Sequence, residues 1–112
     1  MTKTALVLAS LLALTTAAAA AERLPTLSQG TPYASVRNIL LATGWRPVTL
    51  PDADRCSARD TRCKDRPEML SCAGTGMANC LFTWQRNNTV IGVSTIGEEA
   101  SFDGLQCRSG CR

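Results

Sequence analysis

The sequence contains no histidine, and no other absence excludes as much. Histidine is the commonest general base, the commonest zinc ligand and the usual partner of Ser or Cys nucleophiles. The six cysteines include no C-x-x-C pair, the spacing typical of structural zinc sites. We therefore expect no catalytic residues, no metal site and no cofactor, and we predict that the protein is not an enzyme.

A strong charge of one sign is also missing. The chain has 12 Lys and Arg against 9 Asp and Glu, a net charge of +3, and the charges are dispersed along it. Nucleic-acid binding needs a basic stripe or patch, so no nucleic-acid partner is predicted. The sequence gives no indication of the oligomeric state.

Long apolar runs are absent except at the start of the chain. One positive charge at Lys3 precedes an apolar, alanine-rich run over 5–20, and Ala19-Ala20-Ala21 offers a small-x-small cleavage site. This pattern is typical of a secretory signal peptide. The alternative, a transmembrane helix, is less favoured because the run is short and about half alanine. We predict a signal peptide at 1–21, no membrane anchor after cleavage, and a periplasmic or secreted protein.

After cleavage the chain is small and rich in cysteine. Only 22 apolar side chains larger than alanine, cysteines aside, remain to build a core, so one domain is expected at 31–112 after a mobile lead-in at 22–30. Exported domains of this size commonly depend on disulfides. An even number of cysteines predicts three of them, formed by Cys56, Cys63, Cys72, Cys80, Cys107 and Cys111.

The region from Thr31 to Gly44 predicts a helix over about 32–43. Thr31 suits the N-cap, Pro32 the first helical position, and Gly44 the left-handed position just past the end. We expect Trp45 to fold back on Leu40 or Leu41. The predicted buried face contains Tyr33, Val36, Ile39, Leu40 and Thr43.

The region 80–96 predicts a β-hairpin that turns at Asn87-Asn88. Counting outward from the turn pairs Trp84 with Ile91 and Phe82 with Val93 on one face, which we expect the helix to cover. The predicted fold class is α+β, with one N-terminal helix on a three- or four-stranded antiparallel sheet. The expected strands are 46–50, 80–86, 89–96 and 102–107, and 67–72 forms either a further short strand or one helical turn.

Six cysteines allow 15 pairings, and two arrangements are favoured. Cys72–Cys80 is the preferred single pair because the glycine-rich stretch between them can turn tightly. Our first choice for the others is Cys56–Cys63 and Cys107–Cys111, since each pair is short in sequence. The alternative joins Cys56 or Cys63 to Cys107 or Cys111.

Residues 51–68 differ from the rest of the chain, and we call them the charged segment. Ten of these 18 residues are charged, five of each sign, and none is large and apolar. The composition predicts a surface excursion, either plain solvated surface or a contact surface for a partner. The candidate partner-binding residues are Arg55, Arg59, Arg62, Lys64 and Arg66.

A glycine-rich stretch, Gly74-Thr75-Gly76, invites comparison with a phosphate-binding loop. It lacks the Lys-Ser/Thr pair that follows in such loops, so a tight structural turn is the favoured interpretation. A second functional hypothesis places a small hydrolytic site around Glu68 and this turn, with Glu98 or Glu99 as a second carboxylate.

The sequence resembles small exported bacterial proteins of unknown function, over roughly 33–96. The motifs that carry the resemblance are Tyr33-x-x-Val36-Arg37-x-x-Leu40, Gly44-Trp45-x-Pro47, Pro67-Glu68-x-x-x-Cys72-x-Gly74-Thr75-Gly76 and Cys80-x-Phe82-x-Trp84. The resemblance implies the fold and no activity, and Cys56, Cys63, Cys107 and Cys111 are additions to it. The helix-then-hairpin layout is also similar to one repeat of the β-lactamase inhibitor protein, a likeness of form only.

Together these observations favour a small exported, non-enzymatic protein that binds another envelope or extracellular protein, as an inhibitor or immunity factor does. The alternatives are a secreted effector or toxin with the small hydrolytic site, and an envelope protein with no partner at the charged segment.

Overall fold

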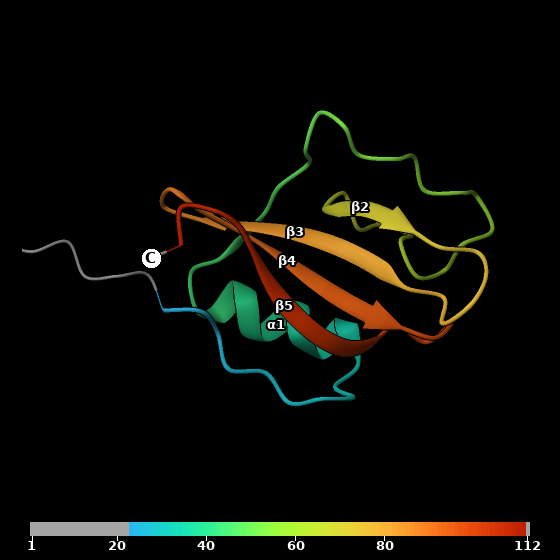
Figure 1. Ribbon diagram of the computed structural model, residues 1–112, viewed down its shortest axis with the longest axis horizontal. Coiled ribbons are helices and arrows are strands. Elements are labelled where there is room, and N and C mark those ends of the chain that lie inside the picture. The colour runs from blue at the N-terminus through green and yellow to red at the C-terminus, as the bar shows by residue number, and fades with distance from the viewer. Residues whose placement is uncertain (1–22, 112) are drawn as a thin grey trace, which may run out of the picture.

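The computed structural model describes residues 23–111 and shows the predicted α+β class. One helix lies across an antiparallel sheet, in which Figure 1 shows β2, β3, β4 and β5. The sheet has five strands: the order is β1-β3-β4-β5, and β2 also pairs with β3. The predicted signal peptide lies outside the described residues. The elements are α1 (Tyr33–Ala42), β1 (Arg46–Pro47), β2 (Met69–Cys72), β3 (Cys80–Arg86), β4 (Thr89–Ile96) and β5 (Ser101–Ser109).

The end of α1 follows the prediction and its start does not. Gly44 has φ +87°, Trp45 N–H donates to Leu40 O at 3.0 Å, and Gly44 N–H donates to Leu41 O at 3.3 Å. These two bonds form a Schellman ending. The prediction that Thr31 caps the helix is wrong, because its hydroxyl donates to the Ser28 carbonyl and Pro32 is the N-cap.

The hairpin has the predicted register. Phe82 lies opposite Val93 and Trp84 opposite Ile91, and all four side chains are fully buried. Asn87 takes the turn with φ 51°. The helix covers this face with the buried residues Tyr33, Val36, Leu40 and, just after its end, Trp45.

The predicted buried face of the helix was too wide. Ile39 is 40% exposed and Thr43 is also exposed, so the contact stripe is narrower than the apolar pattern indicated. Thr43 instead ends the helix, where its hydroxyl donates to the Ile39 carbonyl at 2.9 Å. A stripe at positions 33, 36 and 40 suffices because the sheet beneath supplies three buried aromatic rings of its own, Phe82, Trp84 and Phe102.

The strand predicted at 46–50 is shorter than expected. Only Arg46 and Pro47 form the strand beside β3, and the chain leaves the sheet after Val48, which still bonds to Thr83. It returns at Met69, so the strand option for 67–72 is the one that forms. β1 and β2 therefore share one edge of β3, and the charged segment bridges the gap between them.

All three disulfides join the first-choice pairs, Cys56–Cys63, Cys72–Cys80 and Cys107–Cys111. Cys72 and Cys80 lie opposite each other in the β2–β3 pairing. The alternative in which the charged segment is bonded to the C-terminus does not occur.

Residues 23–30 have specific contacts with the domain. Gly30 N–H donates to Phe102 O at 2.9 Å, and Leu27 packs against the core. Phe102 N–H in turn donates to Thr31 O at 2.8 Å. The lead-in thus runs beside the start of β5, at the edge of the sheet.

Candidate functional site

Thr83 of β3 is hydrogen-bonded to both ends of the stretch 48–68, which contains the charged segment. Val48 N–H donates to Thr83 O at 3.1 Å, and Thr83 N–H donates to Glu68 O at 2.8 Å. The Thr83 hydroxyl also donates to Val48 O at 2.8 Å. Val48 and Glu68 are 20 residues apart in sequence, but both are fixed to the same residue of the sheet.

The last residue of the charged segment is buried, against the prediction that the whole segment lies on the surface. The side chain of Glu68 is 0% exposed, and its Oε1 accepts a bond from Arg37 Nε at 2.6 Å. Tyr33 Oη donates to the same oxygen at 2.8 Å and itself accepts a bond from Trp84 Nε1 at 2.9 Å. We call Tyr33, Arg37, Glu68 and Trp84 the buried network.

The buried network is stable because its members supply one another's hydrogen bonds. Burial raises the pKa of Tyr33, and the neighbouring Glu68 carboxylate raises it further, so the phenol stays protonated as a donor. Hydrogen bonding to Glu68 raises the pKa of Arg37. A charge taken out of water is tolerated where it is paired and hydrogen-bonded, as here.

The positions of Glu68, Gly74 and Glu98 bear on the hypothesis of a small hydrolytic site around Glu68 and the glycine-rich turn. The Glu68 carboxylate faces Tyr33 and Arg37 in the interior, while Gly74 lines a surface hollow with Glu98. The glycine-rich turn is therefore brought together with Glu98 and not with Glu68. A general acid must reach its substrate, and Glu68 has no exposed surface with which to do so.

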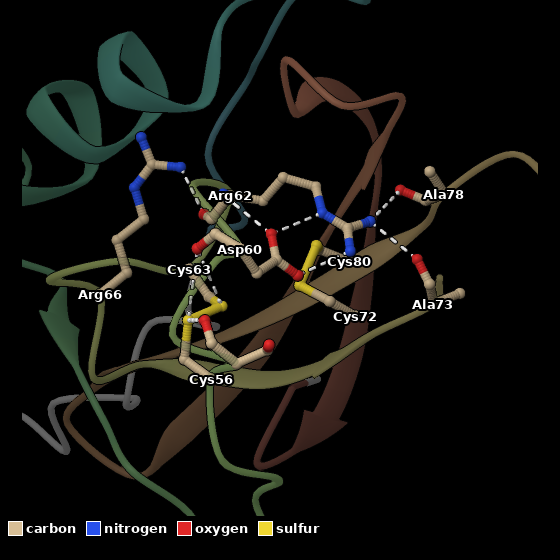
Figure 2. Close-up of a disulfide and its surroundings, with 10 residues drawn as sticks. Cys56, Asp60, Arg62, Cys63, Arg66, Cys72, Ala73, Ala78 and Cys80 are labelled. Carbon is tan, nitrogen blue, oxygen red and sulfur yellow. Dashed lines mark hydrogen bonds and ion pairs between the residues drawn. A yellow bond between two sulfur atoms is a disulfide. The ribbon is translucent and has the colours of Figure 1, made fainter. Parts of the chain in front are cut away.

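Residues 56–63, which we call the disulfide loop, are fixed by an internal ion pair. Arg62 Nε donates to Asp60 Oδ1 at 2.9 Å and Arg62 Nη2 donates to Asp60 Oδ2 at 2.7 Å. Arg62 Nη1 donates to the carbonyls of Ala73 and Ala78 at 2.8 and 3.1 Å (Figure 2). The guanidinium thus joins the disulfide loop to the turn between β2 and β3.

Arg66 is also held inside the segment. Its Nη1 donates to Arg62 O at 2.7 Å, and its guanidinium carbon lies 4.7 Å from the centre of the Tyr33 ring. The second contact is a cation–π interaction with a member of the buried network. Arg66 therefore links the disulfide loop to the core.

The five candidate binding residues divide into two groups. Arg62 and Arg66 bond to the protein itself, so their charges are used internally. Arg55, Arg59 and Lys64 are exposed. The sequence could not separate the groups, because all five lie in one charged run with no apolar pattern to orient them.

Two hollows flank the disulfide loop. The larger, about 850 Å³, lies between the loop and the start of β2, with Leu50, Pro51 and Met69 among its lining and Arg55 at its side. The smaller, about 460 Å³, contains Arg59. Two of the three exposed basic residues, Arg55 and Arg59, therefore stand beside concave surface.

The group formed by Asp60, Cys63 and Cys72 has the spacing of metal ligands, with one donor atom of each within 4.8 Å of the others. Both sulfurs are bonded in disulfides, so neither is available as a thiolate. With these bonds intact the group offers a metal one carboxylate, which is already bonded to Arg62.

Replacing Arg62 with alanine is expected to destabilise the fold by about 1.5–3 kcal/mol, because bonds to a charged donor are lost at Asp60, Ala73 and Ala78. Urea denaturation measures the loss. Arg59→Ala is the matched control, and because Arg59 is exposed its effect should stay within about 0.5 kcal/mol. Equal effects of the two substitutions would contradict the inward placement of Arg62.

The ion pair between Asp60 and Arg62 predicts that the stability of the fold depends on pH. Hydrogen bonds from Arg62 hold the pKa of Asp60 below its ordinary value. A carboxylate whose pKa is lower in the folded than in the unfolded protein stabilises the fold at neutral pH. That contribution is lost as the pH falls from the ordinary pKa of an aspartate through the lower pKa that Asp60 has in the folded protein. Wild type should therefore lose more stability on acidification than Arg62→Ala, as measured by urea denaturation between neutral and strongly acidic pH.

Three disulfides in so small a domain fit an extracellular or envelope protein. Within residues 23–111, no helix has the length and apolar character needed to cross a membrane. Comparisons with protein families, curated proteins and solved structures found no match.

Proposed function

We propose that this chain is a small exported, non-enzymatic protein that binds another envelope or extracellular protein through the disulfide loop and its flanks. One observation carries the proposal: the charged segment uses Arg62 and Arg66 to hold its own shape and leaves Arg55, Arg59 and Lys64 exposed. Surface that is both fixed and charged is suited to recognition.

The fixed shape supports binding because ordering a loop costs free energy when a partner binds. Here the Cys56–Cys63 bond, the Arg62 bonds to Ala73 and Ala78, and the Asp54 N–H bond to Leu70 O at 2.9 Å have already ordered it. The binding partner then encounters a preformed surface, as it does with disulfide-stapled inhibitors.

The charges indicate the chemistry of the partner. Arg55, Arg59 and Lys64 favour acidic groups opposite them, which would speed association and make it sensitive to salt. The exposed carboxylates of Asp52, Asp54 and Asp65 share the segment, so a uniformly acidic surface would be repelled in part. The best partner has an acidic patch with basic neighbours, and an apolar side chain that enters the hollow beside Leu50 and Met69.

An inhibitor or immunity factor is the proposed role, because a rigid scaffold with one presented loop blocks a partner without chemistry of its own. The layout is similar to one repeat of the β-lactamase inhibitor protein, but this is a likeness of form only. It does not identify the target.

The test compares two triple variants that remove the same charge. Arg55→Gln/Arg59→Gln/Lys64→Gln changes the proposed surface, and Arg23→Gln/Arg46→Gln/Arg108→Gln changes exposed residues elsewhere. A protein captured from envelope or culture fractions by wild type is purified, and its affinity for all three forms is measured. We expect a loss of about tenfold or more for the first variant alone. Equal affinities, or no specific capture by wild type, would contradict the proposal.

A further inference from the structure

Two of the three disulfides lie next to each other. Cys63 Sγ and Cys72 Sγ are within 4.8 Å, although each is bonded to a different cysteine (Figure 2). One sulfur belongs to the disulfide loop and the other to β2. A disulfide needs the two sulfurs about 2.05 Å apart. Cys63 Sγ and Cys72 Sγ are therefore close neighbours, and they must approach by up to about 2.7 Å to form a bond.

We propose that Cys56–Cys63 is a thiol–disulfide exchange site for a dithiol, and that Cys72 is the acceptor within the chain. Exchange then converts the present pairs into a Cys63–Cys72 disulfide with free thiols at Cys56 and Cys80. The inference concerns the sulfurs alone and holds whether or not the charged segment binds a partner.

The steps balance as follows. A thiolate of the dithiol attacks Cys56 Sγ, which forms a mixed disulfide, breaks the Cys56–Cys63 bond and leaves the electron pair on Cys63 Sγ. The Cys63 thiolate attacks Cys72 Sγ, forms the Cys63–Cys72 bond and releases Cys80 as a thiolate. The second thiol of the dithiol then displaces Cys56. The dithiol is oxidised to its disulfide by two electrons, and Cys56 and Cys80 take up the two protons.

Access determines where the reaction begins. Cys56 is exposed, whereas Cys63 is 2% exposed and Cys80 is 1% exposed. Cys72 is half-buried, so Cys56 is the most accessible sulfur of these two disulfides. The sulfur displaced by attack on Cys56 is the one placed beside Cys72. The carbonyls of Ser57 and Asp60 lie 3.5 Å from Cys56 Sγ, where they can accept a bond from the thiol that exchange produces.

The remaining disulfide serves as an internal control. Cys107 pairs with Ile91, whereas Cys80 pairs with Thr95, so Cys107–Cys111 lies toward the other end of β4. Its cysteines can be reduced, since Cys107 is exposed, but they have no second disulfide beside them. We expect the Cys107–Cys111 disulfide to take no part in the exchange.

Exchange would change the shape of the disulfide loop. In the present pairing, the loop is closed on itself and β2 is bonded to β3. After exchange the loop is open at Cys56 and bonded at Cys63 to β2. The exposed residues Arg55 and Arg59 would then lie on a segment tied at one point instead of on a closed ring.

The first experiment treats the folded protein with limiting dithiothreitol, traps thiols with N-ethylmaleimide and maps tryptic peptides without reduction. Native protein links peptide 63–64 to peptide 56–59. Exchange links 63–64 to peptide 65–86 and leaves Cys56 alkylated. We expect the second link to be the main product among molecules that have lost the Cys56–Cys63 bond. Partly reduced protein in which peptide 63–64 is never linked to 65–86 would overturn the proposal.

The second experiment removes the competing partners. Cys56→Ser/Cys80→Ser leaves Cys63 and Cys72, and we expect no free thiol after oxidative folding. Cys72→Ser/Cys111→Ser is the control, because it leaves Cys80 and Cys107 without their partners. These two cysteines lie opposite Thr95 and Ile91, on different strands and at different places along β4, so this variant should retain two free thiols. Two thiols in the first variant would also overturn the proposal. If either variant does not fold, the wild-type mapping decides.

Discussion

Glu68→Ala is expected to lower the free energy of unfolding by about 3 kcal/mol. The substitution leaves Tyr33 without its acceptor and Arg37 without its counter-ion. Breaking a buried ion pair typically costs about 3–5 kcal/mol, and the low end applies because the Arg37 side chain is 27% exposed and can bind water. Urea or thermal denaturation measures the effect.

Two further variants make the Glu68 result specific. Glu68→Gln keeps an oxygen for Tyr33 but removes the charge, and should cost less than Glu68→Ala, about 1–2 kcal/mol. Glu99→Ala removes an exposed carboxylate and should change stability by no more than about 0.5 kcal/mol. If Glu68→Ala lowered the free energy of unfolding no more than Glu99→Ala does, the buried network would not join the charged segment to the helix and the sheet as the structure indicates.

Trp84→Ala is expected to cost about 3–5 kcal/mol, because a fully buried ring is removed from between the helix and the sheet. The ring also donates to Tyr33 and lies opposite Ile91, so the cavity would open beside the buried network. Trp84→Phe keeps most of the apolar volume and loses only that donor.

The comparison of the two Trp84 variants separates packing from hydrogen bonding. We expect Trp84→Phe to cost less than half as much as Trp84→Ala in chemical denaturation. Equal losses would mean that the bond to Tyr33, rather than the packing of the ring, is what holds the helix on the sheet.

The hairpin could be predicted from the sequence because its information is local. A two-residue turn fixes the register, and alternation then places Phe82 and Trp84 on one face. The helix ending was equally local, since Gly44 and Trp45 specify it together. The disulfides followed for a similar reason, because each first-choice pair is separated by a short stretch of chain.

The buried network could not be predicted in this way. Glu68 lies in a run of charges and joins Tyr33 and Arg37 from a distant part of the chain, so no periodicity marks it. One sign of the network in the sequence is that Tyr33 and Arg37 are four residues apart and so share a helix face. All four network residues also lie in three short sequence motifs, around 33–40, 67–76 and 80–84, and taking those motifs as one contact set would have pointed to the network.

The candidate site was predicted in outline and not in detail. A charge-rich surface segment with a local disulfide was expected, and it is present. Which basic residues point outward depends on carbonyl groups at Ala73 and Ala78 and on the Tyr33 ring, all outside the segment. Contacts of this kind become visible only in three dimensions.

The central claim is that the charged segment is already ordered before any partner binds. Amide hydrogen exchange of the free protein tests this most directly, at Asp54, which donates to Leu70 O at 2.9 Å, and at Arg66, which donates to Cys63 O at 3.0 Å. We expect both amides to exchange at least about tenfold more slowly than in an unfolded chain, the mark of a closed local structure. Exchange at the unfolded rate would show a mobile segment and contradict the account.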